Sequence, residues 1–135
     1  MNHRINMNLG MQTSIVRTFS QADFDRFARL SGNNNPIHTD LDFSAQARFG
    51  RTVAEGMLLC GVLRGLVDRV VPGGRLTEQS VMFPAPTYAD EPMRFIVTVI
   101  RRSQGNDNAQ FDFELEVIRV DDGIVTCQGR GKVVV

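Results

Sequence analysis

The segment "TVAEGMLLCGVLRGLVDRVV", residues 52–71, decides how the rest of this chain is interpreted. Its first half is apolar on nearly every side of a helix apart from Glu55, and its other charged residues come later, at Arg64, Asp68 and Arg69. A helix that is apolar all round is normally buried. The "PGG" at residues 72–74 ends the segment. We therefore predict a long, buried central helix.

The sequence after this helix changes to the alternating periodicity of β-strands. Four segments alternate apolar and polar residues or are rich in β-branched residues: 76–83, 92–102, 109–120 and 124–135. The Asp122-Gly123 pair between the last two segments is typical of a hairpin turn. We therefore predict four strands, of which the last two are antiparallel neighbours.

The sequence before the central helix predicts one strand and two helices. Residues 14–19 alternate as a short strand does. Ser20 followed by Asp23 resembles a capping box, and Gly32 is a suitable terminator for a helix of about ten residues. A second, short helix is expected at residues 42–48, after a cap at Asp40, within a polar and turn-rich segment.

Helices that precede an antiparallel run of strands indicate an α+β domain. We expect the sheet to curl around the long central helix. The length of 135 residues fits one domain with a sizeable core. We assign residues 13–135 to this domain and residues 1–12 to a flexible leader.

The composition argues against two classes of partner. Fifteen basic and fifteen acidic side chains cancel, which disfavours nucleic-acid binding and electrostatic attachment to membranes. No apolar run approaches the length of a membrane span, and the first residues lack the apolar region of a signal peptide. Cys60 and Cys127 lie in apolar contexts and are interpreted as buried, reduced thiols. We expect a cytoplasmic protein.

The loop "SGNNNPIH", residues 31–38, carries the first candidate for chemistry. His38 can act as an acid or a base near neutral pH. Pro36 restricts Asn35 to an extended conformation, and the asparagines can bond to nearby backbone groups. A stiff loop that ends in an imidazole is suited to presenting that side chain to a pocket.

The residues around this loop resemble the signature of the MaoC-like hydratases, the R-specific enoyl-CoA hydratases with a hot-dog fold. That signature runs Ser-Gly-Asp-x-Asn-Pro-(Leu/Ile)-His-x-Asp, then Phe-Gly, then Ala-His-Gly-Met. The matching residues are Ser31, Gly32, Asn35, Pro36, Ile37, His38, Asp40, Phe49, Gly50, Ala54, Gly56 and Met57. Residues 80–93 resemble a further strand of the family, and the resemblance extends over most of the chain.

The resemblance implies roles for individual residues. The family's aspartate and histidine hold the catalytic water, and their positions here are Asn33 and His38. The backbone N–H of Gly56, at the start of the central helix, is expected to face the thioester carbonyl. Asn35, Glu55 and Met57 are assigned to substrate binding, and Asn35 is also expected to make a structural hydrogen bond.

Two positions depart from the family pattern. Asn33 replaces the aspartate, and an amide can position water but cannot accept its proton. Loss of a general base costs roughly 100- to 10,000-fold in rate. Glu55 replaces the histidine before Gly56. Glu55 is either a helix cap or surface ion-pair partner, or a carboxylate that replaces the one missing at Asn33.

The leading prediction is a hydratase or dehydratase that acts on trans-2-enoyl thioesters of CoA or of an acyl carrier protein. It needs no metal and no cofactor, and it assembles as a homodimer or a higher homo-oligomer. A hot-dog thioesterase that uses Glu55 is one alternative. A non-catalytic subunit that binds acyl thioesters is another, and a third interpretation is an introduced aspartate-to-asparagine change at Asn33.

Overall fold

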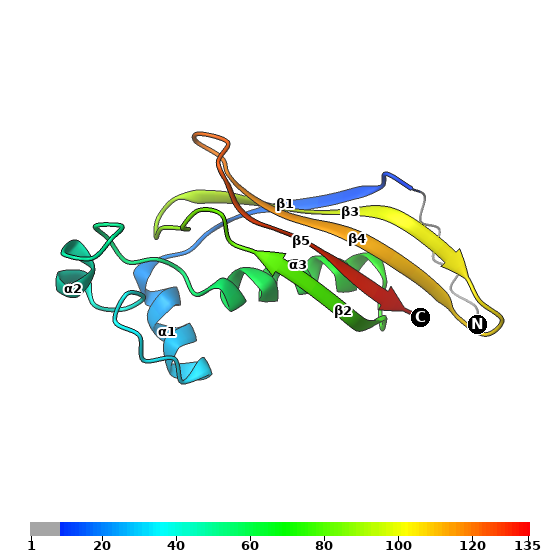
Figure 1. The fold of residues 1–135 in the computed structure, drawn as a ribbon, viewed down its shortest axis with the longest axis horizontal. Helices are drawn as coiled ribbons and strands as arrows, with labels where there is room; N and C mark the ends of the chain where they lie inside the picture. The colour runs from blue at the N-terminus through cyan, green and yellow to red at the C-terminus, as the bar shows by residue number, and fades with distance from the viewer. Residues whose placement is uncertain (1–8) are drawn as a thin grey trace.

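The computed structural model describes residues 9–135 and has one antiparallel sheet with a long helix along one face (Figure 1). The strands follow the order β1-β3-β4-β5-β2 across the sheet. The elements are β1 (Gln12–Thr18), α1 (Gln21–Ser31), α2 (Leu41–Ala45), α3 (Gly56–Val70), β2 (Arg75–Met82), β3 (Pro92–Gln104), β4 (Ala109–Arg119) and β5 (Val125–Val134). This arrangement confirms the predicted α+β class and the hot-dog fold.

The strand pairing follows from the turns in the second half of the chain. Strand β4 pairs with both β3 and β5, and the β4–β5 hairpin turns at Asp122 and Gly123. Gly123 has a φ of 76°, which glycine adopts without strain. The predicted antiparallel pairing of the last two strands is confirmed. Strands β1 and β2 form the two edges of the sheet.

The core lies between α3 and the sheet. Leu59, Leu63 and Leu66 on α3 are buried against a cluster that includes Phe95 and Phe113 on the sheet. Full burial of such side chains contributes roughly 1.5–3 kcal/mol each. The long helix therefore fixes the position of its own first turn relative to the sheet.

Two details of the central helix differ from what its apolar character predicts. It begins at Gly56, as the family resemblance implies, rather than at residue 52, because Val53 pairs with Tyr88 and the Ala54 N–H bonds to the Thr87 carbonyl. Residues 52–55 are therefore held in an extended conformation. The helix is also not buried all round, because Met57 is 63% exposed on the side away from the sheet.

The two short helices lie at the end of the molecule where α3 begins (Figure 1). The predicted capping box of α1 is confirmed, since Ser20 and Asp23 each bond to the other's backbone N–H. Asp40 caps α2 as expected, but this helix ends at Ala45 and is shorter than predicted. These helices frame the loop that carries the candidate site.

The predicted leader lies partly outside the described residues, which begin at residue 9. Within them, the Gly10 N–H bonds to the Val99 carbonyl and the Val99 N–H bonds to the Met11 carbonyl. Gln12 already belongs to β1. Strand β1 therefore begins one residue before the predicted domain boundary at residue 13.

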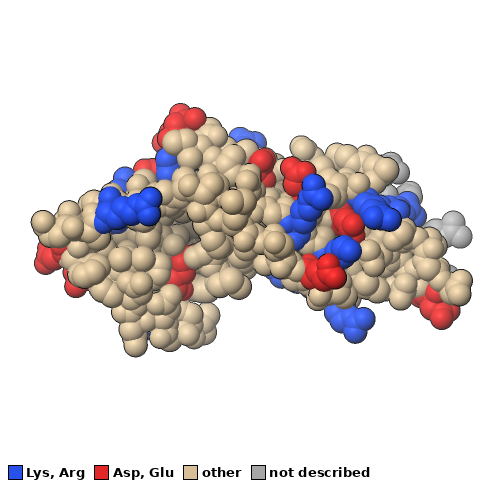
Figure 2. Space-filling view, in the orientation of Figure 1, with Lys and Arg blue, Asp and Glu red and all other residues tan. Residues whose placement is uncertain are grey.

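The surface and the cysteines agree with the composition. Basic and acidic side chains are interspersed on the face shown in Figure 2. Cys60 and Cys127 are buried and free, and a hydrogen bond with Cys60 together with burial raises the pKa of the Cys127 thiol.

Within residues 9–135, no helix combines the length and apolar character needed to cross a membrane.

Candidate active site

The asparagines of the loop after α1 determine its shape. The Asn33 Oδ1 accepts a hydrogen bond from the Asn35 N–H at 3.0 Å, and the Asn35 Oδ1 accepts one from the Ile37 N–H at 3.1 Å. Two successive side chain-to-backbone bonds of this kind stabilise a tight turn. The expected structural hydrogen bond of Asn35 is thus present, and the turn leads directly to His38.

His38 is held with one ring nitrogen bonded and the other free. The side chain is buried, with 8% exposed, and its Nδ1 lies 2.8 Å from the Val53 carbonyl oxygen. A carbonyl oxygen only accepts hydrogen bonds, so Nδ1 carries the proton in the neutral ring. Nε2 has no hydrogen-bond partner within residues 9–135, and its lone pair is available for proton transfer.

Gln21, at the start of α1, bonds both to the backbone of His38 and to the segment that contacts the His38 ring. Its side-chain N–H donates to the His38 carbonyl at 2.9 Å. Its side-chain oxygen accepts a bond from the Thr52 hydroxyl at 2.6 Å. Because Thr52 adjoins Val53, one side chain connects α1, the histidine and the segment to which the imidazole is bonded.

The first turn of α3 presents a backbone N–H at Gly56. The first N–H groups of a helix lack intrahelical partners and mark the positive end of its dipole. A Cβ atom at residue 56 would clash with the Phe83 ring, which occupies the space of a side chain. Glycine therefore suits the close packing of Phe83 against the start of α3.

Glu55 is buried beside this helix start without a cation. Its side chain is part of a residue that is only 6% exposed, and both carboxylate oxygens lie 3.2 Å from the Ser31 hydroxyl. The Asn33 N–H in turn donates to that hydroxyl at 3.2 Å. Glu55 makes no capping bond to α3, and within residues 9–135 it forms no ion pair. Glu55 therefore occupies the N-cap position of α3, as one interpretation expected, but its side chain neither caps the helix nor forms a surface ion pair.

The segment that holds Val53 is supported by Tyr88. Val53 and Tyr88 form an isolated β-bridge. The Tyr88 ring contacts two guanidinium groups, that of Arg51 at 4.3 Å and that of Arg119 at 5.2 Å from its centroid. Contacts of this kind add about 0.5–2 kcal/mol each. They hold in place the strand whose carbonyl oxygen bonds to His38.

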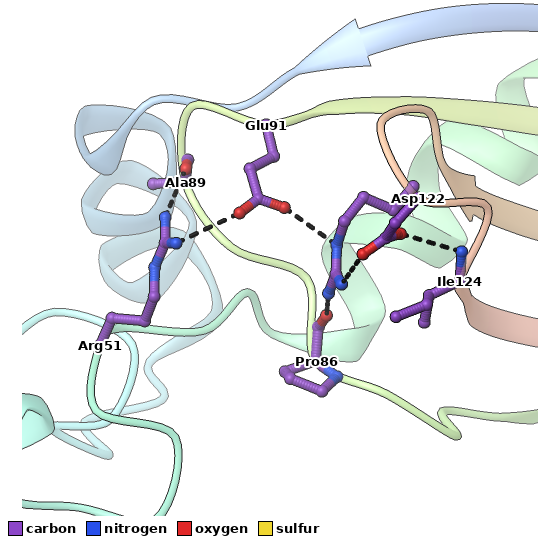
Figure 3. A network of polar contacts seen from close by, with 7 residues as sticks. Arg51, Pro86, Ala89, Glu91, Asp122 and Ile124 are labelled. Atoms are coloured by element: carbon purple, nitrogen blue, oxygen red, sulfur yellow. Dashed lines mark hydrogen bonds and ion pairs between the residues drawn. The ribbon is translucent and has the colours of Figure 1, made fainter.

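The two arginines are joined by a network of polar contacts (Figure 3). The Glu91 carboxylate lies 3.2 Å from Arg51 and 2.9 Å from Arg119. Arg119 also bonds to Asp122 at 3.0 Å and to the Pro86 carbonyl at 2.7 Å. A hydrogen bond from the Ile124 N–H, with a further contribution from Arg119, lowers the pKa of Asp122. Each charge in this network is thus matched by an opposite charge.

Met57 lies on a groove between α1, β1 and the first two turns of α3. The groove has a volume of about 570 Å³. Its apolar lining includes Phe27, Leu30, Leu58 and Val62, and Arg17, Asp23 and Arg26 supply polar groups. A groove of this character is suited to an apolar chain that has a polar end.

The structure thus brings the predicted residues together around the segment from Val53 to Gly56. His38 bonds to it from one side, while Asn33 and Glu55 meet through Ser31. Sequence reasoning gave no role to Ser31, Gln21 or the Val53 carbonyl. Ser31 lies within the quoted motif and could have been considered, but no sequence signal links Gln21 to His38. No cluster of metal-ligating side chains is present within residues 9–135.

Comparison with known proteins identifies relatives over most of the chain. A family model described as a MaoC like domain matches residues 4–120. The chain is 32% identical to an (R)-specific enoyl-CoA hydratase of Aeromonas caviae over 95 residues, which cover 69% of this chain and 71% of that protein. It is 33% identical to an (R)-specific enoyl-CoA hydratase of Rhodospirillum rubrum over 92 residues, which cover 67% and 64% respectively.

A solved structure agrees with this relationship. The structure described as an (R)-hydratase from A. caviae involved in PHA biosynthesis superposes with a TM-score of 0.86 at 25% identity. The superposition covers 95% of this chain and 96% of that one. The sequence comparison and the structural comparison therefore identify the same group of proteins.

Proposed function

Because the chain belongs to the MaoC-like domain family, whose hydratase and dehydratase members are its relatives, we propose that it adds water reversibly to a trans-2-enoyl thioester. The product is an (R)-3-hydroxyacyl thioester. The observation that carries the proposal is His38, whose Nδ1 is bonded to the Val53 carbonyl and whose Nε2 has no hydrogen-bond partner within residues 9–135.

His38 exchanges a proton with the substrate. Hydration forms a C–O bond at C3 and a C–H bond at C2, so one group must deliver a proton to C2. The imidazole is suited to this step because its charge changes near neutral pH. The bond from Nδ1 to the Val53 carbonyl orients the ring so that proton transfer takes place at Nε2.

The Gly56 N–H stabilises the enolate that forms as water attacks C3. The negative charge develops on the thioester oxygen, and a backbone donor at a helix start is oriented before the reaction begins. One such donor contributes about 3 kcal/mol in enzymes where it has been measured. The absence of a side chain at residue 56 permits the thioester to approach.

Asn33 and Asn35 hold the loop and the attacking water. Both side-chain oxygens accept loop N–H bonds, which leaves the amide NH₂ groups to donate. An amide can orient a water molecule in this way. It cannot accept the proton of that water, so the acceptor must be another group.

The acyl chain lies in the groove beside Met57. Its apolar walls suit a hydrocarbon chain, and Met57 adjoins Gly56 in the first turn of α3. Met side chains adapt to apolar groups of varied shape. The thiol carrier is CoA or an acyl carrier protein.

We further propose that two copies join through an edge of the sheet, because β1 and β2 each have a neighbour on one side only. Light scattering of the purified protein should then give a dimer mass or a multiple of it. A monomer mass would contradict this assembly. The reaction needs no cofactor, so dialysis against a chelator should leave the rate unchanged.

The test is the hydration of crotonyl-CoA, followed through the loss of absorbance of its conjugated thioester. We expect turnover, an (R) product on chiral analysis, and a loss of roughly 100- to 10,000-fold in kcat for His38→Ala. His38→Ala should keep the circular dichroism spectrum of the parent. Activity that is unchanged in His38→Ala would contradict the proposal.

A thioesterase that uses Glu55 is the second candidate, because that carboxylate is buried beside the helix start. It predicts release of free CoA, measured with a thiol reagent, and no loss of the enoyl absorbance by hydration. If neither activity is found but acyl-CoA raises the melting temperature, the chain is a binding subunit.

A further inference from the structure

We infer that Glu55 is a catalytic residue that accepts the proton of the attacking water, an inference that rests on the proposed hydratase function. Residue 55 of this chain departs from the family signature given above, which has a histidine there. The same signature has an aspartate at the position of Asn33. The structure places the carboxylate of Glu55 one hydroxyl group away from Asn33.

The first argument is burial without a counter-charge. Carboxylates are rarely buried unless they are paired, because removing the charge from water is unfavourable. Glu55 is 6% exposed, and within residues 9–135 its carboxylate contacts only the Ser31 hydroxyl as a hydrogen-bond donor. A glutamine or an apolar residue would fill the same space without that electrostatic penalty.

The second argument is the direction of the side chain. At the N-cap of α3 a carboxylate could bond to the free N–H groups of the first turn, but Glu55 makes no such bond. It is directed toward the loop of Ser31 and Asn33 instead. A residue that served only to cap the helix would face the helix.

The third argument is unused acceptor capacity. A carboxylate offers about four lone-pair positions, and the Ser31 hydroxyl supplies at most one proton, for which the Ala28 carbonyl at 3.4 Å is a further acceptor. The remaining positions can accept a hydrogen bond from water. Glu55 adjoins Gly56 at the N-terminus of α3, and the inference places that water between the carboxylate and the thioester bound at the Gly56 N–H.

The proton balance of the step is complete. An O–H bond of water breaks as its oxygen bonds to C3, and the proton passes to the Glu55 carboxylate. The π electrons of the C2–C3 bond move onto the thioester as an enolate. His38, protonated at Nε2, gives its proton to C2, and solvent then returns the proton from Glu55 to His38. One water is added, and nothing is oxidised or reduced.

The experiment compares Glu55→Gln with Asn33→Asp and with the double variant, using crotonyl-CoA hydration. Glu55→Gln should lower kcat by roughly 100-fold or more, because the amide keeps the shape but cannot accept a proton. Asn33→Asp alone should change kcat by less than tenfold. The kcat of the double variant Asn33→Asp/Glu55→Gln should be at least tenfold higher than that of Glu55→Gln alone.

Glu114→Gln is the matched control, because Glu114 is exposed on β4 and far in sequence from the site. Its kcat should stay within twofold of the parent. Should Glu55→Gln fail to fold, Ser31→Ala provides the second test, since it keeps the carboxylate but removes its hydrogen bond. We expect kcat to fall at least fivefold in Ser31→Ala, with KM nearly unchanged.

Three results would overturn the inference. A kcat within twofold of the parent for Glu55→Gln would remove the need for the carboxylate. Failure of Asn33→Asp to rescue a folded Glu55→Gln protein would indicate a structural role. Release of CoA that depends on Glu55, without hydration, would assign it to a thioesterase. If the parent protein and Asn33→Asp both lack hydratase activity, the proposed function itself fails, which is a separate outcome.

Discussion

Two groups of charged side chains lie near the bridge between Val53 and Tyr88, and they differ in how their charges are paired. In the cluster of Arg51, Glu91, Arg119 and Asp122, every charged group faces an opposite charge. At the start of α3, the Glu55 carboxylate has a hydroxyl as its partner and no cation within residues 9–135. A fully paired cluster contributes to structure, whereas an unpaired buried charge is more often retained for chemistry.

The largest loss of activity is expected from Gly56→Ala, which changes the start of α3 next to Glu55. The added methyl group meets the Phe83 ring and blocks the approach to the N–H, so kcat should fall by roughly 100- to 1,000-fold. The double variant Gly56→Ala/Phe83→Ala removes the clash but keeps the methyl group. It should regain melting temperature without regaining activity. Recovery of both would mean that the methyl group at residue 56 does not block the approach of the thioester.

Arg119→Met should give the opposite pattern, a loss of stability with activity kept. The guanidinium group is buried and bonded to Glu91, Asp122 and the Pro86 carbonyl, so its removal takes one partner from each of the two carboxylates and leaves the Pro86 carbonyl without that bond. We expect the free energy of unfolding to fall by about 3 kcal/mol. Urea denaturation measures this change, and kcat at a temperature where the variant is folded should remain within a few-fold. A 100-fold loss of kcat in the folded protein would erase the contrast between the two clusters.

Gln21→Leu should have an intermediate effect on both properties. The substitution removes the bonds to the His38 carbonyl and the Thr52 hydroxyl, worth about 1–2 kcal/mol of stability together. We expect kcat to fall by about tenfold, because the histidine is less firmly placed, while KM changes little. Gln104→Leu, at the exposed end of β3, is the control: it also removes two side-chain hydrogen bonds, to the Gly105 and Asn108 carbonyls, but should leave kcat unchanged.

The smallest effect is expected from Asp122→Asn. The folded protein lowers the pKa of Asp122 from its ordinary value of 3.8, mainly through the Ile124 N–H. A lowered pKa stabilises the fold above that ordinary value, and the contribution disappears as the pH falls through the folded pKa. The parent should therefore be slightly more stable than Asp122→Asn at neutral pH and equally stable in strong acid. A difference that grows toward low pH would contradict this assignment.

Much of the fold was predictable because its signals are local. The Ser20–Asp23 capping box, the Asp122-Gly123 turn and the Asp40 cap depend on residues a few positions apart, and all three are present as predicted. The start of α3 was not predictable from apolar character, because residues 52–55 are equally compatible with a helix. Val53 and Ala54 pair instead with Tyr88 and Thr87, a contact between distant segments that keeps them out of the helix.

The sequence by itself determined the α+β class, the family and the identity of the candidate residues His38, Asn33, Glu55 and Gly56. The class follows from the periodicity along the chain, and the family and the candidate residues follow from the resemblance of the motifs to the family signature. Only the tertiary structure decided that the His38 ring bonds to the Val53 carbonyl, and that Glu55 is buried against Ser31 rather than exposed on a helix cap. The physical reason is that burial and hydrogen-bond partners depend on which distant segments pack together, and the free energy of a carboxylate depends on those partners far more than on its neighbours in sequence.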